Sequence, residues 1–379
     1  MVEMIMREMK VRITKIEAIP FGIPIKRFAD AYAEFNKSNA VLVKIYADDG
    51  TIGLGEACAF EPEFYGETLE SIYFSIQKYI APKIIGQDPS NINNVLSIVD
   101  ATLAKSTCAK EGVELALFDL AGKLLKVPVY TLLGGCFRDK IPVACEIGID
   151  EPDIMVEKAK ELLRMGVKTI KIKCSQNIDE SIKRVRAIYE AVGDKVALRL
   201  DPNTHWDVYG TVKAIKKLME FNCHIQYLEQ PIPSWDINGM SRIRKLIDVP
   251  LMADEGIWTP QDVIEFNENE AVDVVNIKIS KTGGLMMAKK IEVVSEAMGL
   301  PCVVGTELDP AISLVAKIHF AASMKNLPFA CEYTELYYLK ESLLKPKIEI
   351  EDGYVKVPKG IGFGVDIDEH ALMKNTIKL

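Results

Sequence analysis

Ionisable residues recur at a regular interval through the second half of this 379-residue chain, each at the end of a short apolar run. Successive members lie 24 to 29 residues apart, which is the length of one strand plus one helix. The members are Lys171 and Lys173 in TIKIKC, Asp201 in VALRLDPN, Glu229 in IQYLEQP, Asp254 in PLMADE, Lys278 in VVNIKIS, and Glu307 and Asp309 in VVGTELD. This repeat predicts parallel strands joined by helices, with a polar residue at the carboxyl end of each strand.

The segments between these strand ends complete the alternation. Amphipathic stretches at 153–165, 179–191, 209–221, 239–247, 260–267, 285–298 and 311–324 are predicted helices, and IPVACEIG and FACEYT are the first and last strands. Eight strands with seven helices predict a closed parallel barrel of the TIM type, with an open doubly wound sheet as the alternative. Closure is favoured because all strand ends of a barrel meet at one mouth, whereas an open sheet gathers them mainly at a switch point.

The first third of the chain has a different pattern and predicts an α+β domain. Residues 11–20 and 40–47 are predicted strands, and the DDG turn at 48–50 followed by TIGLGEA predicts a hairpin. From about residue 68 to 124 apolar positions recur at helical spacing. The glycine-containing tail from 345 is expected to extend the sheet of this first domain. The predicted domains are therefore 9–135, completed by 345–379, and 136–344.

Composition and charge exclude several classes of protein. The net charge of −8 and the lack of a basic stripe argue against a nucleic-acid partner, since binding a phosphate backbone requires clustered Lys and Arg. No apolar run reaches the roughly 18 residues of a membrane span, and the N-terminus does not resemble a signal peptide. Eight cysteines without a C-x-x-C pair predict free thiols, most of them buried, and a cytoplasmic protein.

Three carboxylates lie on consecutive predicted strands, each where an apolar run gives way to a loop. In a barrel, Asp201, Glu229 and Asp254 would point at one place in the mouth. They would raise each other's pKa unless a cation lay between them. Oxygen ligands suit Mg²⁺, with Mn²⁺ as a substitute. The trio therefore predicts a metal site, although a single acid at a strand end is more often a helix cap or a surface ion pair.

Lysines flank this trio on both sides. Lys171 and Lys173 share one face of a strand, where each ammonium is expected to lower the pKa of the other and prepare Lys173, nearer the mouth, as a general base. Lys278 lies on the opposite side of the mouth, whereas Lys281 is expected to be exposed. Metal and lysines together predict abstraction of a proton α to a carboxylate, because the cation and the lysines stabilise the enediolate that forms.

These residues resemble those of the enolase superfamily, and within it the muconate-lactonizing-enzyme subgroup. The matching motifs are KIK at 171–173, DPNTHW at 201–206, LEQP at 228–231, ADE at 253–255, NIKISKTGG at 276–284 and LLGG at 132–135. The resemblance implies a modified (β/α)7β barrel under an α+β capping domain, and a homo-oligomer of two to eight subunits. It also implies Mg²⁺ bound by Asp201, Glu229 and Asp254, acid/base catalysis by Lys173 and Lys278, and a tuning role for Lys171.

The same resemblance leaves the substrate open. The residues expected to contact it are Asn203, Glu307, Asp309, Glu332 and, from the capping loops, Phe28, Tyr32 and Phe60. VVGTELD has no histidine, which disfavours a mandelate-racemase-like pair, and CEYTE at 331–335 lacks the D-x-D of dipeptide epimerases. Glu332 matches the last-strand glutamate of muconate cycloisomerases, but the added acid Glu307 disfavours a dianion and suits a cationic or polyhydroxyl substrate.

The predicted reaction is therefore racemization, epimerization or cycloisomerization of a small carboxylate. Dehydration of an acid sugar is the alternative, since one lysine acting as a base would suffice for it. N-acylamino acid racemization and dipeptide epimerization are less favoured.

Overall fold

Eight parallel strands form the barrel that the alternation predicts. The computed structural model describes residues 11–60 and 62–379. The strands are β4 (Lys140–Ile147), β5 (Thr169–Lys173), β6 (Ala197–Asp201), β7 (Ile225–Glu229), β8 (Leu251–Ala253), β9 (Val274–Ile277), β10 (Cys302–Val304) and β11 (Cys331–Glu332). Their hydrogen-bonded order is β10-β9-β8-β7-β6-β5-β4-β11. Because the last strand pairs in parallel with the first, the sheet curves round on itself and the doubly wound alternative is excluded.

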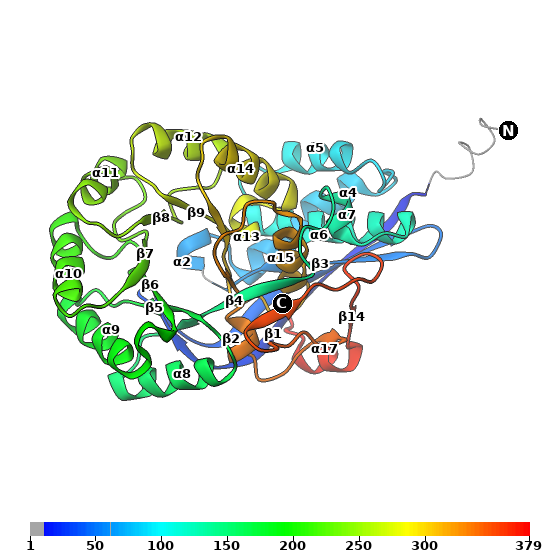
Figure 1. Ribbon diagram of the computed structural model, residues 1–379. Helices are drawn as coiled ribbons and strands as arrows, with labels where there is room; N and C mark the ends of the chain where they lie inside the picture. The colour runs from blue at the N-terminus through cyan, green and yellow to red at the C-terminus, as the bar shows by residue number, and fades with distance from the viewer. Residues whose placement is uncertain (1–10, 61) are drawn as a thin grey trace.

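Helices cover the outside of these strands, as Figure 1 shows. They are α8 (Pro152–Arg164), α9 (Ile178–Val192), α10 (Val208–Glu220), α11 (Ile237–Leu246), α12 (Pro260–Glu268), α14 (Leu285–Ala297) and α15 (Ile312–Ser323), with a 3-10 turn at Gly193–Lys195. In α8, Met155, Ala159 and Leu162 form the buried stripe, and the spacing of such stripes is what predicted each helix to within two residues at either end. Two one-turn helices, α13 (Ile279–Thr282) and α16 (Glu335–Tyr338), were not predicted.

The N-terminal part forms a three-stranded antiparallel sheet of β1 (Ile13–Ala29), β2 (Glu34–Ala47) and β3 (Ile52–Cys58). The predicted hairpin is confirmed, with Tyr46 opposite Ile52. Both first strands are longer than predicted because their pairing continues, past a register shift, to Ala29 and Glu34. The helices that follow β3 in the cap are α2 (Pro62–Tyr65), α3 (Leu69–Phe74), a π-helix at Ser75–Ile80, α4 (Ala81–Ile84), α5 (Ile92–Thr102), α6 (Thr107–Leu125) and α7 (Val129–Leu132).

Glycines let α6 lie directly on β3. A Cβ atom at Gly53 would lie 2.1 Å from the Ala116 carbonyl oxygen, and one at Gly55 would lie 2.1 Å from that of Gly112. Side chains at these two positions would push the helix away from the sheet. The IGLGEA sequence is therefore a packing requirement of the cap.

The C-terminal segment connects the cap with the barrel. β13 (Tyr354–Lys356) pairs antiparallel with β4, while β12 (Leu344–Lys345) pairs with β14 (Asp366–Ile367). The prediction that the tail extends the first sheet is therefore wrong for these strands, because β4 begins before its barrel partners and offers its free start to β13. Helix α17 (Glu369–Asn375) does reach the cap, where Lys44 Nζ lies 2.6 Å from Glu369 Oε1. The domain boundaries themselves stay predictions.

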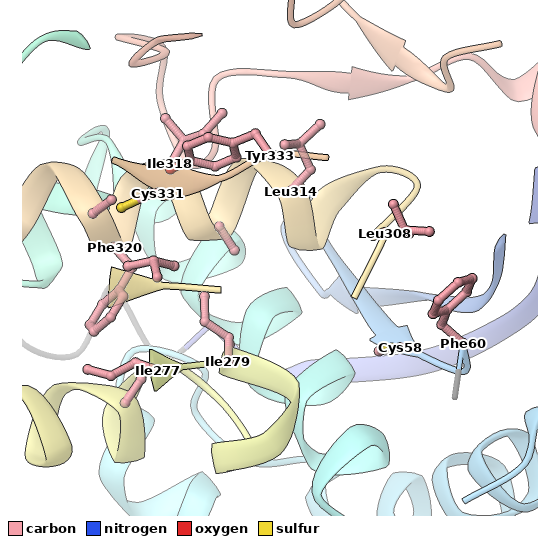
Figure 2. Close-up of a cluster of buried hydrophobic side chains, with 14 of the residues drawn as sticks. Cys58, Phe60, Ile277, Ile279, Leu308, Leu314, Ile318, Phe320, Cys331 and Tyr333 are labelled. Carbon is pink, nitrogen blue, oxygen red and sulfur yellow. The ribbon is translucent and has the colours of Figure 1, made fainter. Parts of the chain in front are cut away.

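One continuous hydrophobic core spans cap and barrel. Figure 2 shows part of it, in which Leu308 from the loop after β10 belongs to the same cluster as Cys58 and Phe60 of the cap. All eight cysteines are free, and only Cys136 is exposed. Within the described residues no helix is long and apolar enough to cross a membrane.

Candidate active site

The strand ends bring the predicted ionisable residues together at the mouth beneath the cap. Asp201 is the last residue of β6 and Glu229 the last of β7, while Asp254 directly follows β8. Lys173 lies in register beside Asp201 on the neighbouring strand. All these side chains are buried, so their charges must be balanced within the cluster.

Lys171 lies among four carboxylates. Its Nζ atom is 2.7 Å from Glu146, 3.0 Å from Glu332, 3.1 Å from Glu229 and 3.5 Å from Asp201. The side chain is fully buried, which opposes its charge, yet these anions raise the pKa of Lys171 well above its usual value. Lys171 is thus the cation that holds the strand-end carboxylates together.

Lys173 is held by Asp201 and Asn203, at 2.8 and 3.2 Å from its Nζ atom, with Glu146 at 3.7 Å. Despite burial, the carboxylates of Asp201 and Glu146 raise the pKa of Lys173 well above its usual value. Lys171 does lower the pKa of Lys173, as expected, but the expected net lowering is wrong for this structure. The neighbouring carboxylates outweigh the repulsion from Lys171.

Glu146, which was not among the predicted site residues, comes from the first barrel strand, β4. It lies in register beside Lys171, so its side chain points to the same face of the sheet. An acid in the otherwise apolar run PVACEIG was the available signal.

Lys278 follows β9, four strands along the ladder from β5. Its Nζ atom lies 2.9 Å from Asp254 Oδ2 and 2.8 Å from Glu307 Oε1. The Phe64 ring of the cap lies over the ammonium at 4.9 Å. Lys173 and Lys278 therefore stand on different walls of the mouth, each in contact with one member of the carboxylate trio.

Lys281 is fully buried, so the prediction of an exposed lysine is wrong. The one-turn helix α13 brings its Nζ atom back to Asp254 Oδ1 at 2.7 Å and to the Asn276 carbonyl oxygen at 3.1 Å. Against the effect of burial, Lys278 and Lys281 hold the pKa of Asp254 far below its usual value.

The donor set suits a hard divalent cation. Nowhere in the described residues do three or more His, Cys, Asp or Glu side chains already stand in a metal-holding arrangement, and each carboxylate of the trio contacts a lysine instead. The cluster contains seven buried carboxylates but four lysines: Glu146, Asp201, Glu229, Asp254, Glu255, Glu307 and Glu332, against Lys171, Lys173, Lys278 and Lys281.

This surplus of negative charge is reflected in the pKa values of two of these acids. Burial and neighbouring carboxylates raise the pKa of Glu229 well above its usual value and that of Glu255 to about 8. A divalent cation among these oxygens would remove the repulsion. The residues present therefore fit the predicted metal.

The predicted substrate contacts lie in different surroundings. Tyr32 crosses from the cap to the mouth, where its hydroxyl donates to Glu255 at 3.2 Å and its ring lies 5.1 Å from that of His205. Asn203 contacts Lys173, and its amide lies 3.4 Å from Glu255. Phe60 packs on Phe35, with ring centroids 4.3 Å apart, and Phe28 packs edge-on against Tyr338.

The remaining predicted contacts are acids that pair with lysines: Glu307 with Lys278, Asp309 with Lys317 at 2.6 Å, and Glu332 with Lys171. Their contact with a substrate stays a prediction. Phe64 and Trp258 stack with their ring centroids 5.6 Å apart, and Trp258 was not predicted. They join cap and barrel beside Lys278.

A capped parallel barrel with acids and lysines at its strand ends defines an enzyme of the enolase type. Residues 15–134 match the mandelate racemase/muconate lactonizing enzyme N-terminal domain, and residues 154–371 match the enolase C-terminal-domain-like family. The chain belongs to the mandelate racemase/muconate lactonizing enzyme family of the enolase superfamily.

Relatives with known names cover nearly the whole chain. N-succinyl-L-Arg/Lys racemase of Bacillus cereus is 31% identical over 97% of this chain and 98% of its own, and its crystal structure has a TM-score of 0.92. The structure of 2-chloromuconate cycloisomerase of Rhodococcus opacus has a TM-score of 0.93 at 29% identity, covering 97% of this chain and 100% of that chain.

A dipeptide epimerase of Enterococcus faecalis, solved with Mg and the dipeptide L-Leu-L-Tyr, has a TM-score of 0.88 at 31% identity and covers 94% of this chain and 99% of its own. The protein is accordingly an isomerase of the racemase, epimerase or cycloisomerase kind.

Proposed function

We propose that the protein is a Mg²⁺-dependent racemase or epimerase that inverts the α-carbon of an N-acylated amino acid or a dipeptide. The observation that carries the proposal is the pair Lys173 and Lys278 on different walls of the mouth, each contacting one carboxylate of the trio. Inversion needs an acid/base group on each face of the α-carbon, which two such lysines supply. The names of the Bacillus and Enterococcus relatives support this class of substrate, which the sequence alone made the less favoured one.

Asp201, Glu229 and Asp254 would hold the cation, Mg²⁺ or, as a substitute, Mn²⁺. When bound, it would stabilise the negative charge that the substrate carboxylate gains as its α-proton leaves. Lys171 would hold two members of the trio together, since it contacts Asp201 and Glu229.

The lysines would transfer the proton. One lysine amine takes the α-proton as the C–H bond breaks, and the electron pair enters the enediolate. The ammonium of the other lysine then loses a proton to the opposite face of the same carbon. Atoms and charge balance, and the two lysines exchange protonation states in each turnover.

Cycloisomerization is the second candidate, because the Rhodococcus relative carries that name and Glu332 lies in the cluster. The Lys278–Glu307 pair disfavours it, since this pair leaves no uncompensated lysine on that wall for the second carboxylate of a muconate-like dianion. Dehydration of an acid sugar would need only one base, so it would leave the second lysine of the pair without a role.

The test is incubation in deuterated water with Mg²⁺ and a panel of N-succinyl and other N-acyl amino acids, dipeptides, muconates and sugar acids. Exchange of the α-proton with inversion supports the proposal, ring closure supports cycloisomerization, and loss of water supports dehydration. No exchange with any amino-acid derivative would refute the proposal.

The base assignment has its own test. Lys173→Ala is expected to abolish inversion while Mg²⁺ affinity, measured by calorimetry, stays close to that of the unaltered protein. Lys168→Ala, at an exposed lysine just before the same strand, is the matched control. Full activity of Lys173→Ala would remove Lys173 from the mechanism.

A homo-oligomer and a cytoplasmic location are also proposed. Light scattering on the purified protein and fractionation of the source cells would test them.

A further inference from the structure

Lys278 has a carboxylate neighbour that the metal trio does not explain. Glu307, in the loop after β10, is buried, and its Oε1 atom lies 2.8 Å from Lys278 Nζ. Asp254 Oδ2 lies 2.9 Å from the same ammonium, and the Phe64 ring covers it at 4.9 Å. Lys278 is thus enclosed by groups from two barrel loops and from the cap.

A glycine brings Glu307 to this position. A Cβ atom at Gly305 would lie 2.4 Å from Asn276 Oδ1 and 2.9 Å from Lys278 Cγ. A side chain at this position would have to displace that of Asn276 or Lys278, so a glycine suits the close passage of the loop after β10 past the end of β9. The close passage sets Glu307 over the lysine.

Lys317 of α15 fixes the loop on both sides of Glu307. Its Nζ atom lies 2.7 Å from Thr306 Oγ1 and 2.6 Å from Asp309 Oδ2. Ser38 of the cap donates to the carbonyl oxygen of Leu308 at 2.7 Å. Glu307 therefore sits in a segment held by the barrel and the cap, which is how a positioning group is made rigid.

The two proposed acid/base lysines differ in how closely a carboxylate outside the metal trio approaches them. Lys173 contacts Asp201, a proposed metal ligand, and its second carboxylate, Glu146, is 3.7 Å away and closer to Lys171. A cation would draw charge from the trio and weaken the hold of Asp201 and Asp254 on their lysines. Among the carboxylates around Lys173 and Lys278 that are not proposed metal ligands, Glu307 would then be the one within hydrogen-bond distance of its lysine, Lys278.

We propose that Glu307 is a positioning residue for Lys278, which orients the amine of that lysine toward one face of the substrate α-carbon. The proposal rests on the proposed racemase or epimerase function. A substitution of Glu307 should therefore slow removal of the α-proton from only one configuration of the substrate, the one that Lys278 deprotonates. Lys173, which deprotonates the other configuration, has other partners. A merely structural role would weaken both faces alike.

The test measures loss of the α-proton signal by NMR in deuterated water, starting separately from each configuration of one substrate. Lys278→Ala and Lys173→Ala first show which configuration each lysine deprotonates. Glu307→Gln, which keeps shape but not charge, is then expected to slow exchange about tenfold to a hundredfold for the Lys278 configuration, since small misplacements of a reacting group cost this much. Exchange of the other configuration should change less than about twofold on the same reasoning.

Asp119→Asn is the matched control, because Asp119 of α6 is equally buried and pairs with Lys123 at 2.6 Å rather than with a lysine of the mouth. Any slowing by Asp119→Asn should be the same for both configurations. Glu307→Met, of similar length and uncharged, repeats the test if the Gln variant does not fold.

Equal slowing of both configurations by Glu307→Gln, or no slowing, would overturn the role of Glu307. Absence of exchange in the unaltered protein would instead overturn the proposed function on which the role rests.

Discussion

Protonation of His319 should destabilise the fold, because this buried histidine is built to be neutral. It lies in α15, where its Nδ1 atom accepts from the Tyr130 N–H at 3.2 Å and its Nε2 atom bonds to the Phe363 carbonyl oxygen at 3.1 Å. Those two bonds require one nitrogen with a proton and one without. An imidazolium would point a second N–H at the N–H of Tyr130.

Burial lowers the pKa of His319 from 6.5 to about 4. Because the folded-state pKa is below the unfolded-state value, the unfolded chain binds more protons between these pH values. The stabilisation is complete above about pH 6.5 and is lost as pH falls toward 4. The full shift corresponds to about 3 kcal/mol, of which about 2 kcal/mol should be lost between pH 7 and pH 5.

The assay is urea unfolding at pH 7, 6 and 5, followed by tryptophan fluorescence and far-ultraviolet circular dichroism. His319→Asn removes the titrating group and should reduce the loss of stability between pH 7 and pH 5 by about 2 kcal/mol. His370→Asn, at an exposed site in α17, is the control and should keep the pH dependence of the unaltered protein. The reasoning is refuted if His319→Asn loses as much stability over this range as the unaltered protein.

Two further substitutions test the cluster at the mouth. Glu229→Gln should lower Mg²⁺ affinity in calorimetry by about tenfold or more, since it removes one charge from the proposed ligand set, and unchanged affinity would exclude Glu229 from it. Lys281→Met should destabilise the fold by roughly 3–5 kcal/mol, because it leaves buried Asp254 Oδ1 without its lysine. The control Lys183→Met breaks the exposed pair with Glu180 and should lower the free energy of unfolding by less than about 1 kcal/mol. Equal melting temperatures for Lys281→Met and Lys183→Met would contradict the argument.

The features that the sequence predicted are those encoded locally. Each strand and helix of the barrel has its own apolar pattern, and strands of a parallel barrel end at one mouth, so Asp201, Glu229 and Asp254 could be expected together. Pairing of β13 with β4 joins segments more than 200 residues apart, and no local pattern specifies it. The burial of Lys281 depends on α13, a single turn too short for periodicity to reveal. The pKa of Lys173 depends on Asp201 and Glu146, both of which come from other strands.

The added acid Glu307 was expected to suit a cationic or polyhydroxyl substrate, but the lysine partners of Glu307 and Asp309 argue for a different basis of selection. A carboxylate with a lysine at 2.6 or 2.8 Å has most of its field cancelled before any substrate arrives. Aromatic side chains lie at the mouth instead: Tyr32 and Phe64 come from the cap, and Trp258 comes from the adjoining barrel loop. Phe64 contacts both Tyr32 and Trp258, and the Tyr32 hydroxyl donates to Glu255. The barrel would then determine the reaction, through charges fixed at strand ends, while aromatic groups where cap and barrel meet would determine which acylated amino acid can approach them.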